Sequence, residues 1–114
     1  MVNRISKVNQ LIKEELSHLL LREIEFPSDF LVTLTRVESS ANLIQAKVFI
    51  SVLPEGKIKE VLQVLNKQIY QLQQKINRRL KMRPVPQIIF IEERKTIEAN
   101  KVEEILEELK KKEN

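Results

Sequence analysis

Hydrophobic side chains recur at two different spacings along the chain, and these spacings predict both helices and strands. Residues 3–22 repeat apolar positions every three or four residues, which predicts an amphipathic helix. Residues 31–38 and 43–53 are rich in β-branched and apolar residues and are separated by a short polar turn, so they predict an antiparallel hairpin. In the second of these segments apolar residues alternate with polar ones, which predicts one buried sheet face.

The longest periodic segment follows the break at Pro54-Glu55-Gly56. Its apolar positions keep a spacing of three or four as far as Leu80, which predicts one long helix or two helices in near register. Pro84 and Pro86 are expected to end this segment, because the residue before a proline is pushed out of the helical region.

Two shorter segments complete the pattern. Residues 88–92 are apolar on both faces, which predicts a third strand, and residues 100–112 repeat apolar positions at helical spacing. The predicted order is therefore helix, strand, strand, long helix or helix pair, strand, helix. Helices that cover one face of the sheet would give a two-layer α+β domain.

Composition limits the class of protein. The 114 residues suffice for one domain with its own hydrophobic core. The absence of cysteine excludes disulfides, thiolate catalysis and cysteine-bound zinc. No apolar run reaches the length of a membrane span, and the N-terminus leads straight into a charged periodic pattern. We therefore expect no signal peptide and a cytoplasmic protein.

Positive charge is concentrated in one segment. The net charge is +4, but residues 56–83 hold eight lysines and arginines and a single acid, Glu60, so the rest of the chain is slightly acidic. Four of these cations fall within residues 77–84, where the long helix is expected to end. On a helical projection several of the cations point away from the apolar stripe, where they can contact successive phosphates. The predicted polyanion-binding face consists of Lys67, Lys75, Arg78, Arg79, Lys81 and Arg83.

This cluster of cations could also be a solvated helix end without a ligand. Cations favour helix C-termini because of the macrodipole, and outer helix faces are often merely solvated. A merely solvated face would carry interspersed glutamates, whereas Glu60 stands alone. An acidic protein partner or nucleic acid of any kind would also suit such a face.

Aromatic residues are too few for extensive base stacking. If the partner is a nucleic acid, contacts to its backbone should therefore dominate. One of the aromatic residues, Phe49, is expected either to be exposed or to pack under the C-terminal helix. The complete set is Phe26, Phe30, Phe49, Tyr70 and Phe90.

Little in the sequence supports catalysis. His18 is the only histidine, and a lone helical histidine is usually structural or exposed. Glu92 and Glu93 are adjacent in a predicted strand and so point to opposite sides, which argues against a catalytic pair. With one glycine, the chain has no phosphate-binding loop, no dinucleotide-binding pattern and no nucleophile elbow. We expect a binding protein that has no catalytic residues, cofactor or metal.

An ordered set of motifs extends along nearly the whole chain. It consists of Arg4, Lys7-Val8, Glu23-Ile24, Leu31-Val32-Thr33-Leu34-Thr35, Ala46-Lys47-Val48-Phe49-Ile50-Ser51-Val52-Leu53, Leu65-Asn66, Met82-Arg83, Pro86 and Phe90. This set resembles the ribosome-binding factor A family. The resemblance implies a KH-like domain of the second topology type over residues 1–97, followed by a charged helical extension over residues 98–114. It also adds Arg4 and Lys7, on the matching N-terminal helix, to the RNA-binding residues.

The resemblance implies a function as well. Members of this family bind the immature small ribosomal subunit and its rRNA, and they assist late maturation and rRNA end processing without enzymatic activity. A role in cold adaptation and release by an assembly GTPase are further implications, and a monomer is expected. The alternative function is a protein-interaction module whose acidic partner docks on the same basic helix face.

One departure from the family concerns the bend within the long helical segment. KH domains that hold single strands use a Gly-x-x-Gly loop between two helices, and the family replaces it with an Ala-x-Gly kink. The corresponding residues here are Gln68-Ile69-Tyr70, with neither alanine nor glycine. Two outcomes are open: a weaker bend at this place, or a bend displaced toward Asn66.

Overall fold

A computed structural model of the chain describes residues 3–93. Its elements are α1 (Arg4–Glu23), β1 (Leu31–Ser39), β2 (Gln45–Leu53), the short 3-10 helix η1 (Glu55–Lys57), α2 (Ile58–Lys67), α3 (Ile69–Arg79) and β3 (Gln87–Glu92). As far as β3, this order confirms the one predicted from the hydrophobic pattern. The helix predicted over residues 100–112, and with it the boundary between residues 97 and 98, lies outside the described residues.

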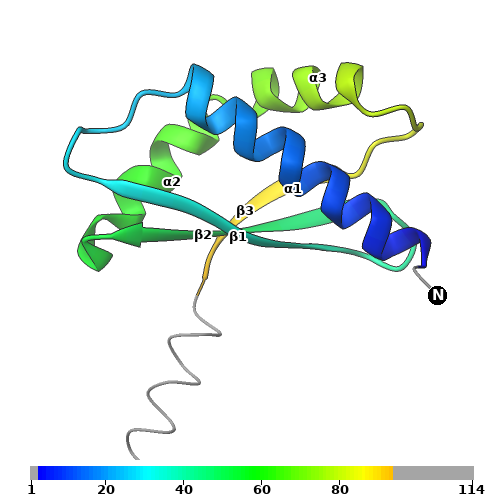
Figure 1. Cartoon of the computed structure of the whole chain (residues 1–114), viewed down its shortest axis with the longest axis horizontal. Helices are drawn as coiled ribbons and strands as arrows, with labels where there is room; N and C mark the ends of the chain where they lie inside the picture. Colours follow the sequence, from blue (N-terminus) through cyan, green and yellow to red (C-terminus); the bar gives the residue numbers. More distant parts are fainter. Residues whose placement is uncertain (1–2, 94–114) are drawn as a thin grey trace, which may run out of the picture.

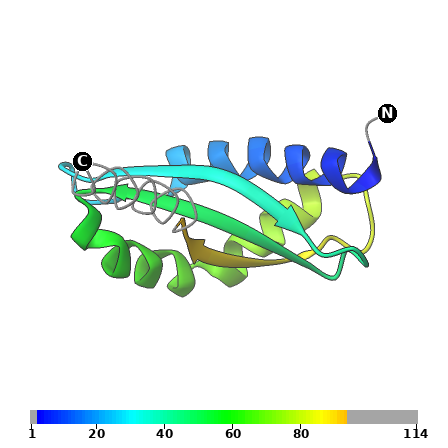
Figure 2. The same ribbon diagram turned by 90° about the horizontal axis from the view of Figure 1, so that it is seen from below.

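The three strands form one sheet in the order β1-β2-β3, and the helices cover one of its faces (Figure 1). β1 and β2 pair antiparallel as the predicted hairpin, whereas β3 runs parallel to β2. The parallel pairing requires the chain to cross the sheet face through α2 and α3. In Figure 2 the strands cross the middle of the view, with α1 above them and α2 below. The result is the expected two-layer KH-like fold of the second topology type.

The core lies between the sheet and the helices. Alternate residues of β2 point into it. β1 contains a bulge: Leu34 pairs with Ile50 and Arg36 pairs with Phe49, so β1 has one extra residue between these two pairs. Leu34 and Val37 are consequently both buried on the helix side. Largely buried residues of the core include Ile12, Leu16, Leu19, Ala46, Val48, Ile50, Val61, Leu65, Ile76 and Ile88.

The second strand begins two residues later than predicted, at Gln45 instead of Leu43. Leu43 has a φ of 59° and belongs to the turn, where its N–H donates to the carbonyl oxygen of Ser40 over 2.9 Å. The side chain of Asn42 accepts from the N–H of Ile44 and so closes the same turn. These local hydrogen bonds compete with strand pairing, so the strand begins further along the sequence than predicted.

The long helical segment is bent at Gln68, the first of the three residues expected to correspond to the family's kink. Gln68 has φ −106° and ψ 6°, and its N–H donates to the carbonyl oxygen of Leu65 over 3.1 Å, which tightens the last turn of α2. Its own carbonyl oxygen accepts from Leu72 N–H and starts α3. Because φ is negative, the bend does not require glycine. Leu65 and Leu72, on either side of the bend, are both buried in the core.

The prediction that the helix continues to the prolines is wrong. α3 ends at Arg79, and Leu80 is already extended, with ψ 132°. Leu80 is only 6% exposed, so its side chain enters the core at the point where the chain turns back toward β3. Lys81 and Arg83 therefore lie on the segment that connects α3 to β3, and the placement of Lys81 on an outer helix face is corrected.

Candidate nucleic-acid interface

An open pocket lies between the end of α3 and the segment that follows it. Its volume is about 610 Å³. Its lining residues are Gln74, Asn77 and Arg78 from α3, and Met82, Arg83, Pro84 and Val85 from the connecting segment. We call it the α3-end pocket. Two arginines from different segments thus line the same hollow, and the amide side chains of Gln74 and Asn77 add donors and acceptors of hydrogen bonds.

Gln73 fixes the connecting segment to α3. Its amide nitrogen donates to the carbonyl oxygen of Pro86 over 3.1 Å and to the side chain of Asn77 over 3.0 Å. Its amide oxygen accepts from the N–H of Ile88 over 2.8 Å. Because one side chain connects the helix to the segment that carries Arg83, the positions of the two pocket arginines are coupled.

Two of the predicted cations line this pocket, and a third lies on the connecting segment. Arg78 and Arg83 line it, and Lys81 is exposed on the chain between them. Within residues 3–93 none of the three forms an ion pair. Arg78 donates through Nε to the backbone oxygen of Gln74 over 3.4 Å. This bond uses only Nε, so the two terminal nitrogens of the guanidinium are available to a ligand.

Two further predicted cations pair with acids on α1. Lys75 forms an ion pair with Glu23, and Arg79 does so with Glu15 over 3.1 Å. These side chains are partly exposed, so solvent screens the pairs and each contributes about 1 kcal/mol or less to stability. Their charges are partly neutralised in the free protein, which distinguishes them from Arg78 and Arg83.

The remaining predicted cations lie away from the pocket. Lys67 is exposed at the end of α2, so the length of α3, roughly 16 Å, separates it from Arg78. Arg4 and Lys7 are exposed on the first two turns of α1. That end of α1 and the end of α3 lie at the same end of the molecule (Figures 1 and 2). The structure thus brings part of the predicted set together and places Arg4 and Lys7 at its flank.

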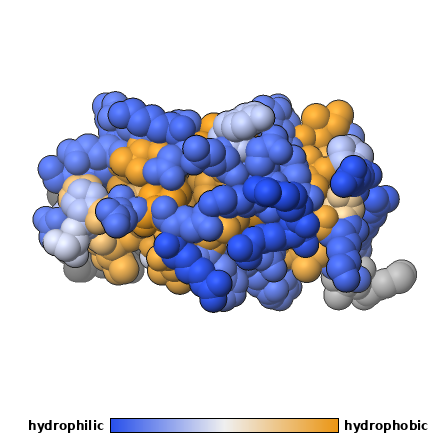
Figure 3. All heavy atoms as spheres, turned by 90° about the horizontal axis from the view of Figure 1, so that it is seen from above, coloured by the Kyte–Doolittle hydropathy of each residue, from blue (hydrophilic) through white to orange (hydrophobic). Residues whose placement is uncertain are grey.

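Sequence reasoning missed the uncharged residues of this surface. Tyr70 and Gln74 are exposed and, at four-residue spacing, lie in line with Arg78 along one side of α3. The sequence signal that could have identified them is this four-residue spacing on the side of the helix opposite the buried Leu72 and Ile76. Seen from the helical side, the molecule is mostly hydrophilic, with hydrophobic side chains visible between the polar ones (Figure 3).

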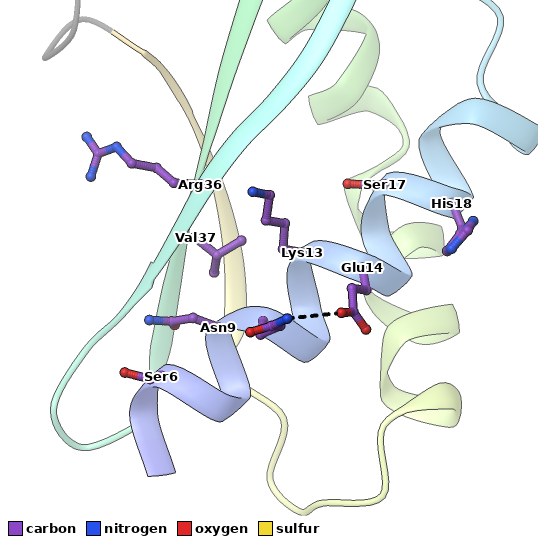
Figure 4. Close-up of a pocket in the computed structure, with 9 residues that line it drawn as sticks. Ser6, Asn9, Lys13, Glu14, Ser17, His18, Arg36 and Val37 are labelled. Carbon is purple, nitrogen blue, oxygen red and sulfur yellow. Dashed lines mark hydrogen bonds between the residues drawn. The ribbon is translucent and has the colours of Figure 1, made fainter. Parts of the chain in front are cut away.

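A second open pocket lies between α1 and β1 and has a volume of about 660 Å³. Its lining mixes Lys13, Glu14 and the exposed His18, and Figure 4 shows Val37 pointing toward the helix and Arg36 pointing away from it. The charges are of both signs and are spread along α1. This pocket therefore lacks the single-sign charge that a polyanion requires.

Arg36 instead packs on the sheet face opposite the helices. Its guanidinium lies 3.7 Å from the centre of the Phe49 ring, and its Nε donates to Glu93 over 2.7 Å. Glu93 also accepts from the hydroxyl of Thr35 and is buried. Phe49 is only 9% exposed, which excludes exposure, one of the two placements expected for it. The alternative, packing under the C-terminal helix, lies outside the described residues.

The described part of the chain offers neither a metal site nor a membrane span. Between residues 3 and 93, no three histidine, aspartate or glutamate side chains gather in a way that could hold a metal ion. None of the helices in that range is both long and apolar enough to cross a membrane.

Comparison with known proteins places the chain in a family. The sequence model of the family described as ribosome-binding factor A matches residues 4–106. Proteins named ribosome-binding factor A from Bdellovibrio bacteriovorus and Brevibacillus brevis are 36% and 38% identical over 107 residues. Each alignment covers 93% of this chain, and they cover 80% and 88% of the two relatives.

Solved structures agree. The crystal structure of ribosome-binding factor A from Thermus thermophilus superposes with a TM-score of 0.68 at 23% identity, over 81% of this chain and 99% of that one, which shows the fold. A homology model of the Thermus thermophilus factor, fitted into a cryo-electron-microscopy map of a 30S complex, gives a TM-score of 0.64 at 25% identity, over 75% and 90% of the two chains. The chain belongs to the ribosome-binding factor A family.

Proposed function

We propose that this chain binds the immature small ribosomal subunit and contacts its rRNA at the α3-end pocket. The observation that carries the proposal is that Arg78 and Arg83, from two segments of the chain, line one open pocket without an ion pair inside the described range. Guanidinium groups suit phosphate because their donors match its oxygens. Family membership supports the partner, since a relative is described in a 30S complex.

The proposed role is that of a non-enzymatic assembly factor. It would assist late maturation and rRNA end processing, contribute to cold adaptation and leave the subunit through the action of an assembly GTPase. A monomer suffices for this role, because the proposed contact surface is complete within one chain. Family membership supports these finer points, each of which is open to experiment.

We rank the proposed RNA-binding residues by the exposure and ion pairing of their side chains. Arg78, Lys81 and Arg83 come first, because their charges are exposed and unpaired in the described part of the chain. Lys75 and Arg79 come second, since a phosphate must compete with an acid of α1 for each of them. Arg4, Lys7 and Lys67 would extend the surface at its flanks.

The test compares two double variants that remove equal charge. Small subunits from cells that lack the factor are titrated with wild type, Arg78→Ala/Arg83→Ala and Lys75→Ala/Arg79→Ala at several salt concentrations. Each lost phosphate contact lowers the slope of log affinity against log salt by about 0.7 to 0.9. We expect the slope to fall by about 1.4 to 1.8 for the first variant and by less than half as much for the second.

Several outcomes contradict the proposal. Equal slopes for the wild type and Arg78→Ala/Arg83→Ala would remove the pocket from the interface. Capture of an acidic protein without subunits or rRNA would support the protein-interaction alternative. Equal affinity for unrelated duplex DNA would indicate a general nucleic-acid binder.

A further inference from the structure

One aromatic side chain is exposed where the others are covered. All five aromatic residues of the chain fall within the described residues, and four of them are buried or partly buried. Tyr70 is 73% exposed. It is the second residue of α3, directly after the bend at Gln68. Because its ring is barely covered by the fold, packing of the domain gives no reason for an aromatic residue here.

The surroundings of Tyr70 suit a nucleic acid. Tyr70, Gln74 and Arg78 follow one another along the outer side of α3, and the span from Tyr70 to Arg78 is about 12 Å along the helix axis. An aromatic ring, an amide and a guanidinium thus share one side of the helix. Arg78 in turn lines the α3-end pocket, so the ring lies on the same surface as the proposed phosphate contacts.

The sequence neighbours of the ring carry no negative charge. The residues near it in the sequence, Asn66, Lys67 and Gln71, are exposed and either neutral or positive. The sequence from Val61 to Ile91 contains no acid. A polyanion can therefore approach the ring without repulsion from its sequence neighbours, whereas an acidic residue beside it would oppose that approach.

We infer that Tyr70 is a stacking platform for one unpaired base of the small-subunit rRNA, with Arg78 holding the phosphate backbone further along the same strand. The inference rests on the proposed function and specifies how the surface distinguishes single-stranded from paired RNA. Every base has an aromatic face, and a ring that is already exposed needs no rearrangement to receive it. A paired base has its faces covered by its neighbours in the stack and does not fit this site.

Binding measurements separate stacking from general apolar contact. Wild type, Tyr70→Phe, Tyr70→Leu and Leu21→Ala are titrated against small subunits and against protein-free small-subunit rRNA. Tyr70→Phe keeps the ring and should bind within about twofold of the wild type, whereas Tyr70→Leu should weaken binding about fivefold or more. The salt slope should stay unchanged, because stacking displaces no counterions. Leu21, 82% exposed on a different helix, is the control for the loss of an exposed apolar side chain and should have no effect.

A spectroscopic measurement reports on the ring itself. Tyr70 is the only tyrosine and the chain has no tryptophan, so tyrosine fluorescence and the tyrosine ring proton signals come from this residue alone. A single-stranded adenosine hexamer at saturating concentration should quench the fluorescence and move the ring signals upfield. The same RNA paired with its complement should do neither.

The outcomes distinguish this inference from the proposed function. If the wild type and Tyr70→Leu bind subunits equally, or if bound hexamer leaves the ring signals in place, the stacking site is refuted while subunit binding stands. If Tyr70→Leu weakens binding to subunits but not to protein-free rRNA, Tyr70 contacts a ribosomal protein and the inference is overturned. If the wild type binds neither subunits nor rRNA, both proposals fail together.

Discussion

Replacing Gln73 by alanine should destabilise the domain and loosen the proposed binding surface. Its side chain makes three hydrogen bonds, two of them to the backbone of Pro86 and Ile88. A typical hydrogen bond contributes about 0.5 to 1.5 kcal/mol, and a buried N–H left without a partner costs about 1 to 3 kcal/mol. Ile88 is buried, whereas Gln73 is only partly so, and water can replace part of the loss. We expect a net loss of about 2 kcal/mol.

The neighbouring glutamine supplies the control. Gln74 is exposed, and its side chain makes no hydrogen bond within the part of the chain that the structure describes. Gln73→Ala and Gln74→Ala change helix propensity by the same amount, so the difference between them isolates the hydrogen bonds. For a domain of this size about 2 kcal/mol corresponds to a fall in Tm of roughly 8 to 16 °C.

Thermal and urea unfolding followed by circular dichroism measure the difference. We expect Gln74→Ala to unfold within about a degree of the wild type. If the two variants unfold with the same midpoint, Gln73 does not hold the connecting segment, and the coupling between Arg78 and Arg83 through it has to be abandoned.

Two other predictions concern the core and the first helix. Ile76→Ala should cost about 2 to 5 kcal/mol, because the side chain is fully buried beneath α3; a loss in urea unfolding below about 1 kcal/mol would contradict this packing. Asn3→Ala should cost about 1 kcal/mol, because the Asn3 side chain caps α1 by accepting from Ser6 N–H over 2.8 Å, and Asn3→Ser in thermal unfolding should restore most of the loss.

The hydrophobic pattern predicted the order of elements because each periodicity is a local property. Leu65 and Leu72 each follow the helical repeat, so the sequence located the helical segment that contains them. The end of α3 was not predictable from the same signal. Pro84 is the strong local stop, but the chain leaves the helix at Leu80, where burial in the core outweighs continued helix formation. Tertiary packing decided that boundary.

Local sequence patterns likewise predicted only part of the candidate site. A helical projection indicates which side of α3 faces the core, but not which element lies beside it. The ion pairs of Lys75 with Glu23 and of Arg79 with Glu15 join residues 52 and 64 positions apart. No local pattern contains that information. The pocket shared by Arg78 and Arg83 depends likewise on the turn after α3, which the sequence placed too late.

The parallel pairing of β3 with β2 has a consequence for folding. β1 and β2 are neighbours in sequence, whereas Gln45 of β2 pairs with Gln87 of β3 across the whole of α2 and α3. Closing so long a loop is slow, so we expect the hairpin to form first and β3 to dock late at the sheet edge. Gln73 finds two of its partners only after that step. The surface proposed to bind rRNA is then among the last parts of the domain to form, and a partly folded chain would not occupy a subunit.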